Sequence, residues 1–224
     1  MRAPISVIIP TLNAQDTLGP CLTSLMAGLE AGLIRELIVT DGGSTDATLD
    51  LAKEWGAEIV TGTASRGGQL QRGCALARGN WLLVLHADTV LDAGWVGPVI
   101  SHLDTHRAGW FRLAFDRGGL AGDVVAGWAN LRSRLGLPYG DQGVLLPRTL
   151  YERVGGYPDQ PLMEDVALAR ALSGKLTRID AIARTSPERY QRQGWLRRGS
   201  RNLWTLARYF GGASPQNLAD SYRR

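Results

Sequence analysis

The feature that most constrains the fold is a set of three apolar segments, each of which ends in polar residues. The segment Trp81–Leu85 is an uninterrupted apolar run that is followed closely by the carboxylate of Asp88. Two upstream segments, Ser6–Asn13 and Leu37–Asp46, also pass from β-branched residues into polar or turn residues. Strands that are apolar throughout are typical of a parallel sheet, and ligands bind beyond the carboxyl ends of such strands. The sequence therefore predicts three strand ends at one edge of a sheet.

Helical segments separate these strands. Leucines recur at helical spacing over residues 18–29, and further helices are predicted over 44–56 and 66–79, with a short strand at 58–61 between them. Right-handed crossovers then give an α/β fold with a mainly parallel sheet. The remaining predicted elements are a strand at 110–115, a helix at 123–135 and a strand at 143–147.

Composition narrows the class of protein. A chain of 224 residues with 44% hydrophobic content fits one domain. Its longest apolar run is five residues, whereas a bilayer span needs about 20, and the N-terminal residues contain no apolar stretch of the signal-peptide kind. Both cysteines, Cys21 and Cys74, fall in predicted helices, which indicates reduced core thiols in a cytoplasmic protein.

Positive charge is concentrated near the C-terminus. Residues 184–224 contain nine arginines against two acidic residues, a net charge of +7, so the other 183 residues sum to −3. We therefore expect a main domain over 1–183 and a basic, largely helical extension over 184–224. In that extension an apolar stripe accompanies Arg197, Arg198 and Arg201; the stripe consists of Leu196, Leu203, Ala207 and Phe210. Two interpretations stay open. The helix contacts an anionic membrane or binds a phosphorylated lipid acceptor, or the stripe packs on the domain and the arginines are solvated.

Six pieces in sequence order resemble a family 2-type glycosyltransferase with the GT-A fold, over nearly the whole chain. The pieces are 7–13, 41–46, 66–79 with 81–85, 86–88, 140–143 and Glu164–Asp165. The combination of His-Ala-Asp-Thr and Gly-Asp-Gln-Gly looks most like a small bacterial subgroup. The resemblance implies a GT-A fold, with a single Rossmann-like sheet flanked by helices, and transfer of a sugar from a nucleoside diphosphate sugar.

The resemblance also implies a nucleotide site. The nucleoside pocket would be formed by Pro10, Thr11, Asn13 and Asp41. A carboxylate that accepts a ring N–H suits uracil and also guanine, and UDP-sugars are favoured. Ala14 and Gly42 depart from the acidic residues that the family commonly has at these positions. Arg66 is the candidate for the diphosphate. The alternatives are a turn role for Asp41 before Gly42 and a solvated loop position for Arg66.

Asp88 is the candidate metal ligand. A divalent ion stabilises the charge that develops on a diphosphate leaving group, and Mg²⁺ or Mn²⁺ fits this role. Mg²⁺ typically takes one or two protein carboxylates besides phosphate and water oxygens, so Asp88 would suffice. The family more often has a second acid where this chain has His86. The alternative is that Asp88 caps a helix beginning near Asp92.

By the same resemblance, Asp165 is the catalytic base. It would take the proton from an acceptor hydroxyl while that oxygen attacks the anomeric carbon, which inverts the configuration. Asp141, Gln142 and Glu164 are the candidates for contacts with sugar or acceptor hydroxyls. The alternatives are that Glu164 and Asp165 only favour a helix N-terminus, and that residues 140–143 form a plain turn.

The same residues bear on three other classes of protein. A dinucleotide-dependent oxidoreductase would need a Gly-x-Gly-x-x-Gly segment after the first strand, which this chain lacks. A sugar-nucleotide pyrophosphorylase-like nucleotidyltransferase shares the architecture, and a noncatalytic nucleotide-sugar-binding protein is the other alternative. No nucleic-acid recognition motif accompanies the basic extension. The acceptor is not identified, and the extension is compatible with a lipid-linked one.

Overall fold

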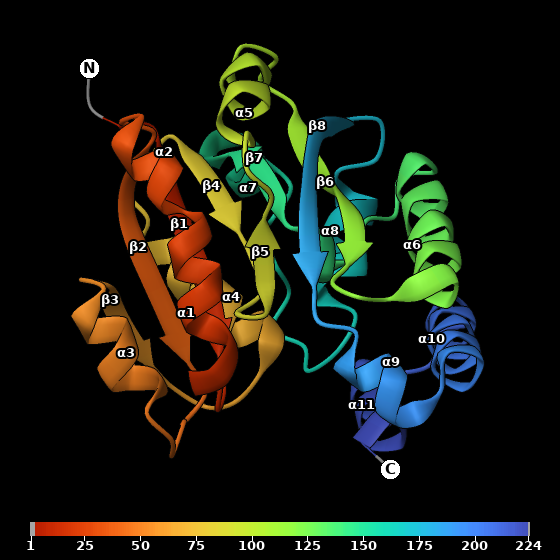
Figure 1. The fold of residues 1–224 in the computed structure, drawn as a ribbon. Coiled ribbons are helices and arrows are strands. Elements are labelled where there is room, and N and C mark those ends of the chain that lie inside the picture. Colours follow the sequence, from red (N-terminus) through yellow and green to blue (C-terminus); the bar gives the residue numbers. More distant parts are fainter. Residues whose placement is uncertain (1–2, 224) are drawn as a thin grey trace.

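An eight-stranded sheet forms the centre of the molecule in the computed structural model (Figure 1). The model describes residues 3–223, apart from the side chains of Arg189 and Arg223; Arg224 of the predicted extension and residues 1–2 lie outside. The strand order is β3-β2-β1-β4-β7-β6-β8-β5. The strands are β1 (Ile5–Thr11), β2 (Ile34–Asp41), β3 (Glu58–Thr61), β4 (Trp81–Val84), β5 (Thr89–Leu91), β6 (Ala108–Phe115), β7 (Val144–Pro147) and β8 (Leu176–Thr185).

The sheet is mixed but mostly parallel, as the sequence predicted. β1 pairs in parallel with β2 and β4, β2 with β3, and β6 with β8, whereas β7 is antiparallel to β4 and β6. β5 and β8 were not predicted; β8 pairs with β5 in antiparallel fashion. β8 also crosses the predicted boundary at 183/184, because Arg184 and Thr185 pair with the strand β5. The sheet therefore continues into the segment expected to form the extension.

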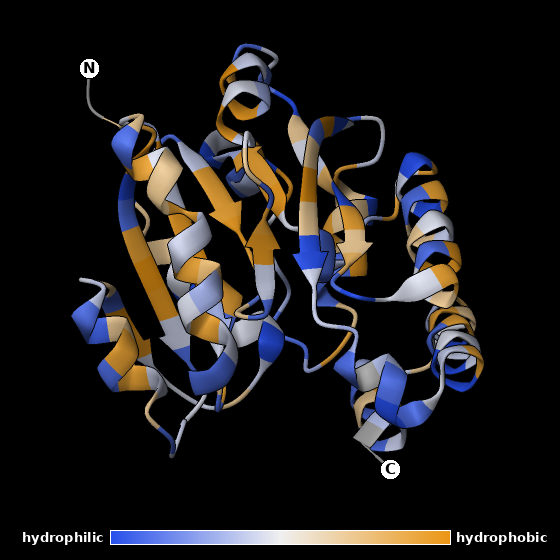
Figure 2. Ribbon diagram, viewed as in Figure 1, coloured by the Kyte–Doolittle hydropathy of each residue, from blue (hydrophilic) through white to orange (hydrophobic). Residues whose placement is uncertain are grey.

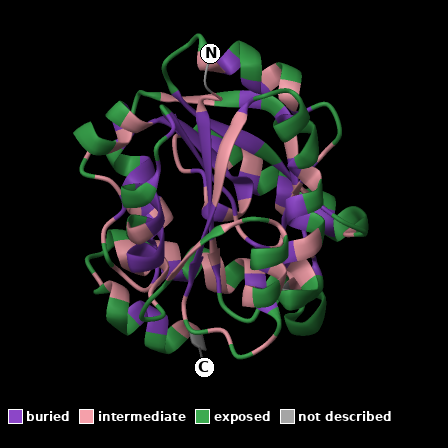
Figure 3. Ribbon diagram, turned by 90° about the vertical axis from the view of Figure 1, so that its left-hand side faces the viewer, coloured by how far each residue is buried: buried purple, intermediate pink, exposed green. Residues whose placement is uncertain are grey.

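Alternating side chains of the strands face two helical layers. Val7 and Leu83 belong to a core with α1, α3 and α5, whereas Ile8 and Leu82 belong to a core with α4, α7 and α8. The hydropathy colouring shows the apolar strands between more polar helices, and the turned view shows buried residues concentrated there (Figures 2 and 3). The helices are α1 (Gln15–Ser24), α2 (Met26–Glu30), α3 (Thr48–Glu54), α4 (Arg66–Leu76), α5 (Val96–Leu103), α6 (Gly119–Arg134), η1 (Gly140–Gln142), α7 (Arg148–Arg153) and α8 (Glu164–Ala171).

Three further helices form the C-terminal segment beside α6 and α8 (Figure 1). They are α9 (Glu188–Gln193), α10 (Trp195–Phe210) and α11 (Pro215–Arg223). Leu206 of α10 and Leu218 of α11 pack against Met163 and Val166. The predicted apolar stripe is not the packed face, since Leu196 is 90% exposed and Leu203 and Phe210 are also exposed. The interpretation in which this stripe packs on the domain is therefore wrong, whereas contact with a membrane stays a prediction.

Two further expectations concern cysteines and membrane spans. Cys21 and Cys74 are free and buried, as predicted. Burial raises the pKa of each thiol to about 12, so both stay protonated. Among residues 3–223, no helix is long and apolar enough to cross a membrane.

Candidate functional site

The carboxyl ends of β1 and β2 bring two predicted nucleotide-binding residues together. Thr11 and Asp41 are partners in the parallel ladder, and the Thr11 hydroxyl donates to Asp41 Oδ1 at 2.9 Å. Asp41 Oδ2 accepts the backbone N–H groups of Gly43 and Ser44, each at 2.7 Å, and Oδ1 also accepts the Ser44 hydroxyl. Asp41 is fully buried, yet these hydrogen bonds lower its pKa against the effect of burial. In this structure Asp41 has the turn role that was the alternative for it.

Asn13 closes the same loop from the β1 side. Its backbone has φ +49°, a left-handed conformation that asparagine tolerates better than most residues. The Asn13 backbone N–H donates to the Ser44 hydroxyl at 2.8 Å, and its side-chain oxygen accepts the Thr45 N–H at 2.9 Å. Pro10 is half-buried just before it on β1. Two loops joined by hydrogen bonds thus follow the two strand ends, where a nucleoside was expected.

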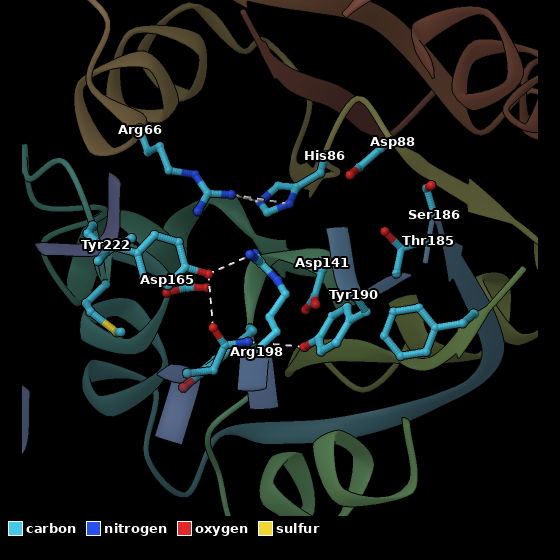
Figure 4. Close-up of a pocket in the computed structure, with 15 residues that line it drawn as sticks. Arg66, His86, Asp88, Asp141, Asp165, Thr185, Ser186, Tyr190, Arg198 and Tyr222 are labelled. Carbon is cyan, nitrogen blue, oxygen red and sulfur yellow. Dashed lines mark hydrogen bonds between the residues drawn. The ribbon is translucent and has the colours of Figure 1, made fainter. Parts of the chain in front are cut away.

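A cavity lies beside this loop pair, at the ends of β4, β6 and β8 (Figure 4). It brings together four of the predicted site residues, which are Arg66, Asp88, Asp141 and Asp165. They come from four separate segments of the chain, and three of them are carboxylates. The cavity therefore gathers one positive and three potentially negative side chains, which makes it the candidate site.

Asp88 lies beyond the end of β4. The alternative that it caps a helix is wrong, because β5 intervenes and α5 begins only at Val96. Among residues 3–223, the Asp88 carboxylate has no hydrogen bond or salt bridge. The same residues contain no group of three or more His, Cys, Asp or Glu that could hold a metal ion. Asp88 could therefore contact a cation as one carboxylate ligand, and the remaining ligands of that cation would be oxygens from outside the protein.

Arg66 is the first residue of α4 and is held in place from two sides. Its Nε lies 3.5 Å from Glu164 Oε1, and its Nη2 lies 3.3 Å from His86 Nε2. Burial acts to lower the pKa of Arg66, but Glu164 and Asp165 raise it overall, so the guanidinium stays charged. Its side chain is 42% exposed, and it lines the cavity rather than extending into solvent.

Glu164 does not line the cavity, which corrects its expected contact with sugar or acceptor. The residue is 1% exposed, and one carboxylate oxygen, Oε2, has no partner. Burial raises its pKa to about 7; Arg66 opposes this effect and Asp165 adds to it. Glu164 therefore acts behind the cavity wall, where it holds Arg66.

Asp165 faces the cavity from the start of α8. Met163, which directly precedes α8, has φ +65°, a strained conformation for a residue with a side chain. Asp165 Oδ2 accepts the Gly140 N–H at 2.8 Å, and Oδ1 accepts the Val166 N–H at 2.7 Å. The backbone turn thus separates two adjacent acids, sending Glu164 inward and Asp165 to the cavity.

The turn η1 supplies Asp141 to the cavity but not Gln142. A side chain at Gly140 would collide with the His86 ring, so glycine allows this close approach. Asp141 Oδ1 is buried without a partner. Burial raises the Asp141 pKa to about 6; Arg132 opposes the rise, whereas Asp165 and Asp88 contribute to it.

Gln142 does not line the cavity, which corrects its expected contact with sugar or acceptor hydroxyls. Its side chain is fully buried, and Oε1 accepts the Ser133 hydroxyl at 2.5 Å and the Tyr139 N–H at 3.3 Å. Its Nε2 donates to the Phe111 carbonyl and to Asn130, both at 3.3 Å. Because the amide has no remaining hydrogen-bonding capacity, Gln142 fixes the turn and does not contact the predicted ligands.

The C-terminal helices supply cavity residues that the sequence reasoning missed. They are Tyr190, Asn202 and Tyr222, and Arg198, which the sequence analysis considered only for a membrane or lipid contact, lines the cavity with them. Arg198, Asn202 and Thr205 recur at helical spacing, which marks one face of α10. That signal was overlooked because the other face carries the larger apolar residues.

Comparison with known proteins decides the family. Residues 6–126, more than half of the chain, match the profile described as Glycosyl transferase family 2. The chain belongs to this family. Over 116 residues it is 39% identical to the PGL/p-HBAD biosynthesis glycosyltransferase of Mycobacterium bovis, which covers 48% of this chain and 44% of that protein. Over 141 residues it is 32% identical to the glucosyl-3-phosphoglycerate synthase of Mycolicibacterium paratuberculosis, covering 55% and 43%. The matches thus span less than half the length of these relatives.

Solved structures of other proteins share the fold. Staphylococcus aureus TarS aligns with TM-score 0.62 at 16% identity, covering 84% of this chain and 38% of TarS. The glucosyl-3-phosphoglycerate synthase of Mycobacterium tuberculosis aligns with TM-score 0.56 at 23% identity, covering 82% and 70%. That enzyme was crystallised with Mn²⁺, UDP and glucosyl-3-phosphoglycerate. The GT-A architecture expected from the sequence is confirmed, whereas the resemblance to a subgroup stays a prediction.

Because the pKa of Asp141 is raised, we can predict how a change at this residue affects thermal stability without any ligand. Because the folded pKa of about 6 exceeds the ordinary value of 3.8, the folded state favours the neutral acid. Its contribution to stability is full below pH 3.8 and is lost as pH rises through 6. Asp141→Asn is therefore expected to raise the Tm at pH 7.5 by at least about 3 °C, since a pKa difference of this size corresponds to up to about 3 kcal/mol.

Thermal unfolding at pH 4 and pH 7.5 measures this effect. At pH 4 the variant and the wild type should unfold within about 1 °C of each other, because the wild-type acid is then mostly neutral. Asp180→Asn is the control, since the Asp180 side chain is 79% exposed. An equal Tm for Asp141→Asn and wild type at pH 7.5 would show that the Asp141 carboxylate is not destabilised by its surroundings.

Proposed function

We propose that this protein is an inverting glycosyltransferase that moves a sugar from a nucleoside diphosphate sugar, with UDP favoured, to an acceptor hydroxyl. The observation that carries the proposal is one cavity in which Arg66, Asp88 and Asp165 converge from separate elements beside the β1 and β2 loops. Support comes from relatives: the Mycobacterium tuberculosis synthase was solved with Mn²⁺ and UDP-glucose, and TarS with UDP-GlcNAc. The acceptor is not identified by these relatives.

In this proposal Asp165 is the general base. An acceptor hydroxyl gives its proton to the Asp165 carboxylate while its oxygen forms a bond to the anomeric carbon. The bond from that carbon to the diphosphate oxygen breaks, and its electron pair leaves with the nucleoside diphosphate. Attack opposite to the leaving group inverts the anomeric configuration. The Gly140 and Val166 N–H groups fix the carboxylate so that it needs no reorganisation before it accepts the proton.

The donor would lie along the loops after β1 and β2, with its diphosphate next to Arg66. Pro10 lies near the end of β1 and Asn13 in the loop after it, and we retain both as proposed nucleoside contacts. A base N–H can reach Asp41 only if it replaces the hydroxyl of Thr11 or Ser44, because both oxygens of the carboxylate are already in use. Thr11 and Asp41 are therefore proposed to read the base together.

Asp88 fits a divalent ion, Mg²⁺ or Mn²⁺, as its main protein ligand. The fit rests on the free carboxylate of Asp88 and on its place in the cavity with Arg66. An ion with one protein carboxylate takes its other ligands from phosphate and water, so no larger acidic cluster is required. When bound, the ion would neutralise the charge of the departing diphosphate.

A thermal-shift screen tests this proposal and its alternatives. UDP-sugars with Mn²⁺ are expected to raise the Tm more than other nucleoside diphosphates, because a ligand at 100 times its Kd adds about 2.7 kcal/mol. A pyrophosphorylase-like nucleotidyltransferase would instead consume a nucleoside triphosphate and release pyrophosphate. A noncatalytic binding protein would show the Tm shift without any hydrolysis or transfer of the sugar.

A second proposal concerns location: we propose a cytoplasmic protein that contacts an anionic membrane through α6 and α10. Large apolar residues on one face of α6, and Leu135 directly after it, are exposed; those on the helix are Leu120, Val124, Trp128 and Leu131. Leu196, Leu203 and Trp204 extend the exposed apolar surface onto α10, which contacts α6. Both helices lie on the same side of the molecule (Figure 1). Such a surface, with tryptophans, is typical of an interfacial helix face.

Charge supports an anionic lipid surface. Arg117, Arg134 and Arg197 are exposed on or beside these helices, against Asp116 and Asp123. Two of the arginines expected to contact the membrane, Arg198 and Arg201, are not available for that contact. Arg198 is buried, and Arg201 donates to the carbonyls of Ser221 and Tyr222.

The double change Trp128→Ser and Trp204→Ser tests the membrane contact. It is expected to weaken binding to anionic vesicles at least about tenfold, because each inserted tryptophan contributes on the order of 1 kcal/mol or more. Vesicle flotation measures the bound fraction, and Leu29→Ser is the control, since Leu29 is 53% exposed on α2. Wild type that does not bind vesicles, or that forms a dimer abolished by the double change, would contradict the membrane contact.

A further inference from the structure

Arg198 is a buried cation at the cavity. It is 9% exposed and comes from α10, and its end lies next to the Tyr222 hydroxyl among the other cavity side chains (Figure 4). Its Nη1 donates to Gln193 at 2.7 Å and its Nη2 to the Tyr222 hydroxyl at 2.9 Å. The guanidinium carbon lies 5.4 Å from the Tyr190 ring centre and 5.6 Å from that of Tyr222.

In the described part of the chain, the guanidinium of Arg198 is not in direct contact with a carboxylate. Among residues 3–223, no carboxylate forms a salt bridge with Arg198, and its buried Nε has no hydrogen-bond partner. A buried charge without a counter-ion is costly, and neutral partners such as Gln193 and Tyr222 offset only part of that cost. An anion that enters the cavity would supply a counter-charge to the Arg198 guanidinium.

The position of Arg198 identifies which substrate carries this anion. Arg66, on the α4 side of the cavity, is the residue that the donor diphosphate would meet. Arg198 comes from the C-terminal helices, with Tyr190, Asn202 and Tyr222 joined to one another by hydrogen bonds. The acceptor must reach Asp165, the proposed base, and these helices border the cavity that contains it.

We propose that Arg198 binds an anionic group of the acceptor, a phosphate or a carboxylate, so that the acceptor is an anionic hydroxyl compound. This inference rests on the proposed function, since it assigns the acceptor of the same reaction. Tyr190, Asn202 and Tyr222 position the guanidinium for this contact. Charge-assisted hydrogen bonds from an arginine to such oxygens are stronger than neutral ones, so the anion contributes strongly to acceptor affinity.

Calorimetric titration of inorganic phosphate tests the site. The protein is first saturated with UDP and Mg²⁺, so that the donor diphosphate position is filled. One phosphate per chain is expected to bind, and to raise the Tm relative to chloride at equal ionic strength. Failure of wild type to bind phosphate under these conditions would overturn the proposal. Phosphate that binds only without UDP would also overturn it, because the anion would then occupy the donor site.

Two variants assign the binding to Arg198. Arg198→Gln is expected to weaken phosphate binding at least about tenfold, while Arg197→Gln, its exposed neighbour on α10, changes it less than about twofold. The UDP affinity of both variants should match wild type. Equal phosphate binding by Arg198→Gln and wild type would overturn the assignment, and so would a loss of UDP affinity in this variant. If Arg198→Gln unfolds, Arg198→Lys, which keeps the charge, provides the comparison.

Transfer to small acceptors separates this inference from the proposed function. UDP-sugar turnover is measured with glycerol, glycerol 3-phosphate, glycerate or anionic phosphatidylglycerol vesicles. Higher turnover with the phosphate, the carboxylate or the vesicles than with glycerol supports an anionic acceptor and distinguishes a soluble from a lipid source. Turnover that is equal with glycerol and with all of the anionic compounds would overturn the inference but leave the glycosyltransferase proposal standing. Absence of UDP binding would instead contradict the proposed function.

Discussion

Asp165→Asn is expected to slow sugar transfer by at least about 100-fold, because it removes the only group proposed to take the acceptor proton. The effect should fall on kcat, with the affinity for UDP changed less than about twofold, since Asp165 is not proposed to contact the donor. Pre-steady-state and steady-state transfer rates with UDP-sugar, together with calorimetric titration of UDP, measure the two quantities.

Glu164→Gln is the matched comparison for this prediction. It changes the adjacent acid on the same turn of α8, but Glu164 is buried and does not line the cavity. Its raised pKa of about 7 means that the wild-type group is already partly neutral at neutral pH. We therefore expect a smaller loss than for Asp165→Asn. Near-normal transfer by Asp165→Asn, with an unchanged Tm, would assign the base to another residue such as Asp141.

The two acids show where sequence reasoning works and where it stops. Their place at the start of a helix was predictable from local sequence, and α8 does begin at Glu164. Which of them faces the cavity depends on the left-handed backbone at Met163 and on contacts to Arg66 and Gly140, which are distant in sequence. Non-local contacts of this kind leave no periodic signal.

The strand ends were predictable because each is a local pattern. Apolar runs that end at Thr11, Asp41 and just before His86 specify β1, β2 and β4, and their parallel pairing aligns these ends at one edge. β8 was missed although Ile179, Ala181 and Ala183 alternate with exposed or half-buried residues, a strand pattern. Charged residues such as Arg178 and Asp180 interrupt the apolar pattern of this strand.

The C-terminal helix was predicted, but its orientation was not. Apolar residues usually face the core, whereas here Leu196 and Trp204 face outward and Arg198 faces the cavity. The periodicity of a sequence shows which residues share a helix face, but it does not show which face packs against the rest of the protein. The neighbouring helix α6 is also apolar on its exposed face. The face of α10 that has a partner is the one carrying Leu206, which packs against Met163 and Leu218.

Asp88→Ala is expected to abolish the gain in UDP affinity that Mn²⁺ or Mg²⁺ provides, and to slow transfer by at least about 100-fold. The physical reason is that Asp88 lines the cavity together with Arg66, and among residues 3–223 its carboxylate forms no hydrogen bond or salt bridge, so it is available to a cation. Titration of UDP with and without Mn²⁺ measures the gain independently of turnover. Affinity for UDP alone should be unchanged, because the nucleoside loops and Arg66 are intact.

Asp16→Ala is the control, because Asp16 is exposed on α1 and outside the cavity. It should retain the full effect of Mn²⁺ on UDP binding. The Tm of Asp88→Ala should equal or exceed that of wild type in the absence of ligands, since Asp88 makes no hydrogen bond that the change would remove. If Mn²⁺ strengthens UDP binding to Asp88→Ala as much as to wild type, Asp88 is not the metal ligand, and Asp141 becomes the residue to test.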